Sequence, residues 1–190
     1  MDNECKEQAI LKIYLVSLLI TIFALTGCAE PEPPSQDIFI YVDVGVSEEH
    51  LGYLQEALEY YENVWCVTDT FKVYEYDFEG DYSQNLGPRS INIRGEEVVY
   101  KQDQVLSALA SWVSYANVNY FAGRIAFDNN NDFTAREYKL IFVHELGHIF
   151  RLKHVDDSSN IMNDEISDLT SSDLTDDQIM STKIFVRLDQ

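Results

Sequence analysis

Four short segments of the chain carry the hydrophobic pattern of β-strands. Residues 37–46 (DIFIYVDVGV) place apolar side chains at alternating positions, and several of these are β-branched. Residues 71–78 (FKVYEYDF) repeat the alternation, and 90–94 and 123–127 are shorter apolar runs. Because successive side chains of a strand point to opposite faces, this pattern predicts four strands of a sheet that buries one face.

Two segments in the first two thirds of the chain show the spacing of amphipathic helices. The first begins after Ser47, a residue type that favours the N-cap position, and runs to about Trp65. The second covers 103–118, where apolar residues recur three or four positions apart. These residues are Val105, Leu106, Leu109, Trp112 and Val113. We expect each helix to pack its apolar side against the sheet.

Two more helices are predicted towards the C-terminus. One covers about 135–152, and Thr134 and Glu137 form a capping-box pair at its start. The last covers 173–186. Strands and helices follow one another without internal repeats, so the sequence predicts a single α+β domain over 37–190.

The first 27 residues have the organisation of an export signal. Their apolar run, 13–25, is shorter than the ~20 residues that a helix needs to span a bilayer. The run ends in LTGC, which resembles the box of bacterial lipoproteins, where the signal is removed and a lipid is attached to the cysteine, here Cys28. A Pro-rich segment, 28–36, follows and is typical of an extended tether.

This N-terminal segment predicts an extracytoplasmic protein that is anchored by its lipid to a bacterial membrane, at the outer membrane or the cell surface. Acidic residues outnumber lysines before the apolar run, whereas a signal peptide normally begins with positive charge. An ordinary signal peptide or an uncleaved anchor are therefore the alternatives.

The strongly negative net charge limits the kinds of molecule that the protein can bind. The formal net charge of −20 excludes nucleic acid and a polybasic membrane contact, because both need positive charge on the protein. We expect a monomer that contacts the membrane only through its lipid and acts on peptides or proteins.

The cysteines leave one free thiol in the mature chain. Cys5 is removed with the signal and Cys28 is lipidated, so Cys66 stays as a free thiol that we expect to be buried in the core.

Three of the four histidines fall within one string of the form His-Glu-x-x-His-x5-His, at His144, His148 and His154. Residues four apart on a helix share a face, so His144 and His148 can present their imidazoles to one ion. His154 completes a set of three ligands and leaves a position open for water or substrate, as a catalytic Zn²⁺ requires. Glu145 adjoins the first ligand and can accept the proton of a water bound there. The string therefore predicts a hydrolase with one catalytic zinc.

The string and its surroundings resemble the metzincin metallopeptidases, and the matrixin branch in particular. In metzincins a tight turn with a methionine beneath the metal follows the zinc helix, and Met162 occupies that place here. Segment 123–134 is similar to the matrixin edge strand over the cleft and the calcium-binding turn after it, and 174–179 to the start of the last helix. The resemblance implies a small mixed twisted sheet with an antiparallel edge strand, an active-site helix, a Met-turn and a C-terminal helix. It also implies that substrate pairs with an edge strand made of Gly123, Arg124, Ile125, Ala126 and Phe127.

Several positions depart from the family pattern. Arg151 stands where the family has a glycine that leaves the helix in a left-handed conformation, so the string could also be a decayed motif. Arg124 and Ala126 replace ligands of a structural zinc, so a second zinc is not expected. Asp128 and Asn130 are candidate Ca²⁺ ligands, but a neutral amide lowers the expected affinity and a plain turn is the alternative.

The sequence thus predicts a zinc endopeptidase in which three neutral imidazoles bind the metal and Glu145 is the general base. The position of Met162 would also suit an ordinary core residue. A first alternative takes Glu165 as the third ligand and leaves His154 uninvolved. A second, from a different functional class, is a non-catalytic surface lipoprotein that binds zinc or a partner.

Overall fold

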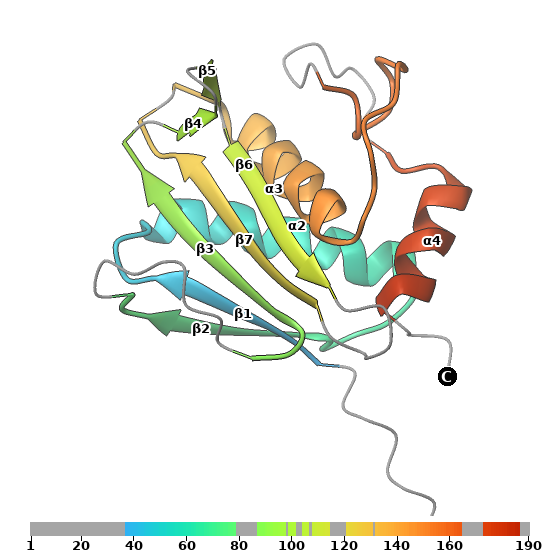
Figure 1. Cartoon of the computed structure of the whole chain (residues 1–190), viewed down its shortest axis with the longest axis horizontal. Coiled ribbons are helices and arrows are strands. Elements are labelled where there is room, and N and C mark those ends of the chain that lie inside the picture. The colour runs from blue at the N-terminus through green and yellow to red at the C-terminus, as the bar shows by residue number, and fades with distance from the viewer. Residues whose placement is uncertain are drawn as a thin grey trace, which may run out of the picture. The chain divides into compact units, whose positions relative to one another are not determined.

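A five-stranded mixed sheet forms the framework of the computed structural model (Figure 1). In order across the sheet, its strands are β2 (Phe71–Tyr76), β1 (Ile38–Asp43), β3 (Ser90–Glu96), β7 (Phe121–Asp128) and β6 (Ala108–Ser114). The first four run parallel, and β6 pairs antiparallel with β7. Two short strands, β4 (Val99–Lys101) and β5 (Gln104–Leu106), form a separate antiparallel pair.

The structure describes residues 37–78, 87–97, 99–101, 104–106, 108–114, 121–130, 132–164 and 173–186. The predicted export signal, the tether and Cys28 lie outside these ranges. Within them, no helix has both the length and the apolar character needed to cross a membrane.

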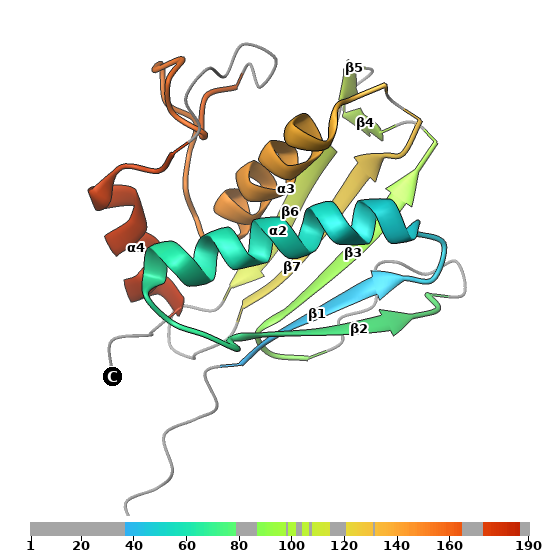
Figure 2. The same ribbon diagram turned by 180° about the vertical axis from the view of Figure 1, so that it is seen from behind.

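Three helices accompany the sheet in the described part of the chain: α2 (Glu48–Trp65), α3 (Ala135–Ile149) and α4 (Asp176–Val186). Helices α2 and α3 lie side by side on one face of the sheet, and α4 lies near the C-terminal end of α2 (Figures 1 and 2). Both long helices begin as the sequence predicts. The Ser47 hydroxyl accepts a hydrogen bond from the backbone N–H of His50, and Thr134 and Glu137 form a complete capping box.

The core lies between the sheet and these two helices. Alternation along β1 buries Ile38, Ile40 and Val42 and leaves the residues between them half-buried. Helix α3 approaches β7 closely, since a Cβ on Gly123 would lie 2.5 Å from Cδ1 of Ile149. A cluster of aromatic rings fills the end of the core next to α4. Its members are Tyr61, Trp65, Phe121 and Phe150.

The helix predicted over 103–118 is wrong. Residues 104–106 and 108–114 form β5 and β6, and 115–118 lie outside the described ranges. The apolar spacing of this segment fits a helix. However, Ala108, Ala110 and Trp112 are apolar residues at every second position, which is also the period of a β-strand. Pairing with β7 gives the backbone sheet partners along one side of the strand, and this tertiary interaction outweighs the local spacing.

The prediction that Gly123–Phe127 forms the edge strand is also wrong. These residues belong to β7, which lies between β3 and β6, so both of its sides are paired. The antiparallel edge strand exists as expected, but β6 provides it. The prediction came from the resemblance of 123–134 to the matrixin edge-strand segment, and the helix predicted at 103–118 did not reveal that β6 would pair with the free side of β7.

Cys66 is exposed, contrary to the prediction that it is buried. It ends α2 in a left-handed conformation with φ 57°, and this conformation turns its side chain away from the core that Trp65 enters. The other cysteines lie outside the described residues.

Candidate metal centre

Helix α3 presents two imidazoles on one face, as the spacing of the string requires. His144 is buried and His148 half-buried, and their ring centroids are 4.6 Å apart. Both nitrogen ligands come from the last two turns of a helix whose other side is fixed in the core. The helix therefore holds the two side chains at a set separation before any ion is bound.

A tight reversal after α3 brings His154 to the other two histidines. Arg151 adopts φ 70°, its N–H donates to the carbonyl of His148 (3.0 Å), and the N–H of Leu152 donates to the carbonyl of Gly147 (2.9 Å). This pair of hydrogen bonds is the Schellman motif that commonly ends a helix on a left-handed residue. The conformation expected for a glycine is thus adopted by Arg151, and the chain runs back beside the helix it has just left.

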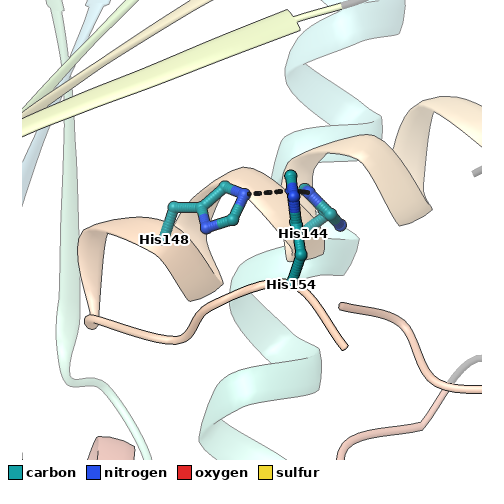
Figure 3. Close-up of side chains that lie close together, drawn as sticks. All are labelled: His144, His148 and His154. Atoms are coloured by element: carbon teal, nitrogen blue, oxygen red, sulfur yellow. Dashed lines mark hydrogen bonds between the residues drawn. The ribbon is translucent and has the colours of Figure 1, made fainter. Parts of the chain in front are cut away.

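The three imidazoles converge through their Nε2 atoms (Figure 3). Nε2 of His154 lies 3.2 Å from Nε2 of His144 and 3.0 Å from Nε2 of His148. Around a tetrahedral Zn²⁺ with Zn–N bonds of ~2.0–2.1 Å, ligand nitrogens are ~3.3 Å apart. The spacing therefore fits this ion, and these residues form the one cluster of three metal-ligating side chains within the described residues.

Main-chain carbonyls fix the tautomers of the two helix histidines. Nδ1 of His144 donates to the carbonyl of Ile161 (2.8 Å), and Nδ1 of His148 donates to the carbonyl of Leu152 (3.0 Å). In the neutral imidazole the other nitrogen, Nε2, then carries a lone pair. Two lone pairs thus face the single Nε2 of His154, which can donate only one proton. A cation satisfies all three nitrogens, so the donor set fits a metal.

Met162 lies in a tight turn beneath the histidines, as the family resemblance predicts. The N–H of Asn163 donates to the carbonyl of Asn160 (3.0 Å), and Met162 is fully buried. The Asn160 side chain accepts from the N–H of Met162 (2.8 Å) and donates to the side chain of Gln178 on α4 (2.9 Å). The turn is therefore held both by its own residues and by the last helix.

The turn and α3 meet at a glycine. A Cβ on Gly147 would lie 2.5 Å from the sulfur of Met162 and 3.1 Å from the hydroxyl oxygen of Tyr61. That hydroxyl donates to the carbonyl of Val143 (2.9 Å). The absence of a side chain at Gly147 therefore lets the methionine approach the helix directly behind the two histidines.

Burial keeps the imidazole of His144 uncharged at neutral pH. The pKa of His144 is lowered to about 4, mainly by the loss of hydration and in addition by the neighbouring imidazoles of His148 and His154. The hydrogen bond to Ile161 and the carboxylate of Asp164 oppose this shift. Glu145, one residue along α3, is also buried, with 6% of its surface exposed. A buried carboxyl group thus follows, in the chain, a neutral imidazole that can bind a metal.

The sequence profile of the matrixin family of peptidases matches residues 70–184, more than half of the chain. The chain belongs to the matrixin family. Its fold is similar to that of archaemetzincin from Methanopyrus kandleri, with a TM-score of 0.56 and 12% identity over 82% of this chain and 99% of that one. No curated protein matches the sequence. The family and the histidine cluster together place the chain among the zinc metallopeptidases, and the predicted metzincin-like α+β fold is confirmed.

Within the part of the chain that the structure describes, His154 is the residue that joins the other two histidines of this matrixin. Glu165, the alternative ligand, lies outside the described residues. The side chain of Asp128 accepts from the N–H of Asn130 (2.9 Å), and that of Asn130 donates to the carbonyl of Glu97 (3.2 Å). These bonds form a turn at the end of β7, and Ca²⁺ binding there stays a prediction.

Two features of the centre were missed from the sequence. The carbonyls of Ile161 and Leu152 carry no sequence signal, because any residue type provides one. The second is Trp112, whose ring lies 6.4 Å from the ring of His148 and nearly parallel to it, at 11°. It was assigned to the false helix, so its position beside a metal ligand could not be recognised.

Replacing Gly147 by alanine should destabilise the protein by ~1–3 kcal/mol, because the new methyl group would overlap the sulfur of Met162. Gly52→Ala is the matched control, since nothing lies within 4 Å of a Cβ there. Alanine in that helix position should stabilise by ~0.5–1 kcal/mol. Urea unfolding of the metal-free proteins measures both changes. Equal effects of the two substitutions would contradict the close contact between Met162 and the helix.

The stability of the metal-free protein should fall as the pH is lowered from about 6.5 towards 4. In that range the unfolded chain takes up a proton on His144 and the folded chain does not, so the free energy of unfolding decreases. Between about pH 7.5 and pH 5, the titration of His144 should lower the free energy of unfolding by roughly 2 kcal/mol. Urea unfolding in EDTA, compared with His144→Gln, isolates this share. The same pH dependence in both proteins would show that His144 is not held neutral.

Proposed function

We propose that this matrixin is a zinc-dependent endopeptidase that hydrolyses peptide bonds of extracytoplasmic proteins or peptides. The observation that carries the proposal is the convergence of three Nε2 atoms, two of them fixed as lone-pair donors. The buried Glu145 directly follows the first ligand on α3. His144, His148 and His154 would hold the ion. The fourth coordination position is then free for water or substrate, which is typical of catalytic and not of structural zinc.

The residues of the site divide the work of hydrolysis. When bound, Zn²⁺ acts as a Lewis acid that lowers the pKa of water and polarises the scissile carbonyl. Glu145 accepts the proton of the attacking water and passes it to the leaving amine. The carbonyls of Ile161 and Leu152 hold the rings of His144 and His148 in the tautomer that binds metal.

Strand β6 is the proposed docking edge for the substrate. Its inner side pairs with β7, and no strand of the described chain pairs with its outer side. An extended peptide can add to such an edge through main-chain hydrogen bonds. Since these bonds require backbone on both sides of the scissile bond, this mode of binding favours cleavage within a chain over removal of a terminal residue.

We also propose that Cys28 carries a lipid that anchors the enzyme to a bacterial membrane. The support is the LTGC box after a short apolar run and the Pro-rich tether that follows it. The substrates would then be proteins or peptides at the outer membrane or the cell surface.

Glu145→Ala should retain one zinc per chain and lower kcat by about 10²–10⁴-fold, because the ligands stay and the proton acceptor is lost. Cleavage of a mixed peptide library by the zinc-loaded full-length protein, with zinc content measured by atomic emission, tests both parts. Glu59→Ala, an exposed glutamate on α2, is the control and should cleave like the wild type.

Two outcomes would contradict the proposal. Full activity in Glu145→Ala would exclude this residue as the base. If the wild type binds one zinc and cleaves nothing, the catalytic proposal fails and a zinc-binding lipoprotein is the better description.

In a bacterial host fed an alkyne-tagged fatty acid, the wild-type chain should be labelled and recovered with membranes. Cys28→Ser should lose both the label and the membrane association. Cys66→Ser controls for the loss of a thiol in general and should be labelled like the wild type. Label that persists in Cys28→Ser would overturn the lipid anchor.

A further inference from the structure

Helix α4 contacts the turn that carries Met162 through a pair of side-chain amides. Asn160 Nδ2 donates to Gln178 Oε1 (2.9 Å), and Gln178 Nε2 donates to Asn160 Oδ1 (3.3 Å). Two reciprocal hydrogen bonds fix the orientation of both planar amides, because each donor and each acceptor then has a set direction. Asn160 is buried, so water cannot easily take the place of a lost partner.

The amide of Asn160 also holds the peptide unit that orients His144. Its Oδ1 accepts from the N–H of Met162 (2.8 Å). The carbonyl of the same peptide unit belongs to Ile161, and it accepts from Nδ1 of His144 (2.8 Å). A peptide unit is planar and trans, so its N–H and C=O point in opposite directions. Fixing the N–H at Asn160 therefore fixes the direction of the carbonyl that His144 uses.

The second helix histidine is oriented by a different part of the chain. Nδ1 of His148 donates to the carbonyl of Leu152, which follows the left-handed turn at Arg151. The hydrogen bonds that start at Gln178 lead to the carbonyl used by His144 and not to this one. A change at Gln178 should therefore disturb one of the two helix histidines and spare the other.

Gln178 has a second role, because it also caps the start of α4. Its Oε1 accepts from the backbone N–H of Thr175 (2.9 Å), and the hydroxyl of Thr175 accepts from the backbone N–H of Gln178 (3.3 Å). This is the reciprocal arrangement of a capping box. The hydroxyl of Thr175 serves the helix cap alone, whereas Gln178 serves the cap and the turn. The two roles can therefore be separated by substitution.

We infer that Gln178 is a positioning residue of the metal centre. It holds Asn160 and, through the peptide unit between Ile161 and Met162, keeps His144 in the orientation that binds metal. The inference rests on the metal binding that the proposed function requires, and not on turnover. Groups that orient a metal ligand from outside its coordination sphere typically change metal affinity by about 10–100-fold when they are lost.

The test uses the zinc-loaded full-length protein and its Gln178→Ala variant. Zinc affinity, measured by competition with a chromophoric chelator, should fall about tenfold in Gln178→Ala. In ¹⁵N NMR spectra, the Nδ1–H signal of His144 should be lost through exchange with water, because its acceptor is no longer held in place. The Nδ1–H signal of His148 should persist. Loss of both signals, or of neither with unchanged zinc affinity, would overturn the inference.

Thr175→Ala is the matched control, since it weakens the cap of α4 and leaves the amide pair intact. It should lower the Tm and keep the zinc affinity and both Nδ1–H signals of the wild type. Gln178→Glu is the conservative variant, because it keeps the acceptor for Thr175 and Asn160 and lacks only the donor. Its zinc affinity should lie between those of the wild type and Gln178→Ala. The same loss of affinity in Thr175→Ala would show that Gln178 acts only through the stability of α4.

A double-mutant cycle tests whether Gln178 acts through Asn160. If it does, Asn160→Ala combined with Gln178→Ala should bind zinc no more weakly than Asn160→Ala alone. Fold-changes that multiply would overturn this path. None of these measurements needs cleavage of a peptide. If the wild type binds zinc and cleaves nothing while these results hold, the catalytic proposal fails and the positioning role of Gln178 stands.

Discussion

The metal centre depends on the reversal of the chain directly after α3. Two of the three ligands are on the helix, and the third can reach them only if the chain turns back within a few residues. The left-handed conformation of Arg151 produces this turn, and it costs a non-glycine residue ~1–2 kcal/mol. The Arg151 guanidinium lies over the ring of Phe185 on α4, 5.1 Å from its centroid. Such a contact contributes ~0.5–1 kcal/mol at an exposed site, so it offsets part of the cost.

The same reversal positions His154 and also fixes the ring orientation of His148. Leu152, the first residue after the left-handed position, directs its carbonyl at Nδ1 of His148, while its N–H closes the helix on Gly147. The side chain of Leu152 is buried, which fixes the peptide on either side of it. One turn thus ends the helix, positions His154 and sets the tautomer of His148. The turn that contains Met162 sets the tautomer of His144, because the carbonyl of Ile161 accepts the hydrogen bond from its Nδ1.

Much of this arrangement could be predicted because it depends on local chemistry. The spacing of His144 and His148, the capping box at Thr134 and the left-handed turn at Arg151 follow from helix geometry or from the family pattern, and the structure bears them out. The error at 103–118 arose because apolar spacing there fits a helix and a strand equally. The pairing of β6 with β7 decided between them, and that contact joins residues that the local pattern cannot relate.

The hydrogen bonds from the Nδ1 atoms of the two helix histidines are accepted by main-chain carbonyls, and this affects how the metal centre tolerates amino-acid substitutions. In many metal sites the outer partner of a histidine is a carboxylate, so one substitution removes it and alters the charge around the metal. Here both acceptors, at Leu152 and Ile161, are carbonyls that every amino acid possesses. Sequence drift at these two positions can alter packing, but it cannot delete the hydrogen bond or introduce a proton that competes for it. The electronic environment of the helix histidines is therefore encoded in the path of the backbone, and relatives with little sequence identity can inherit it unchanged.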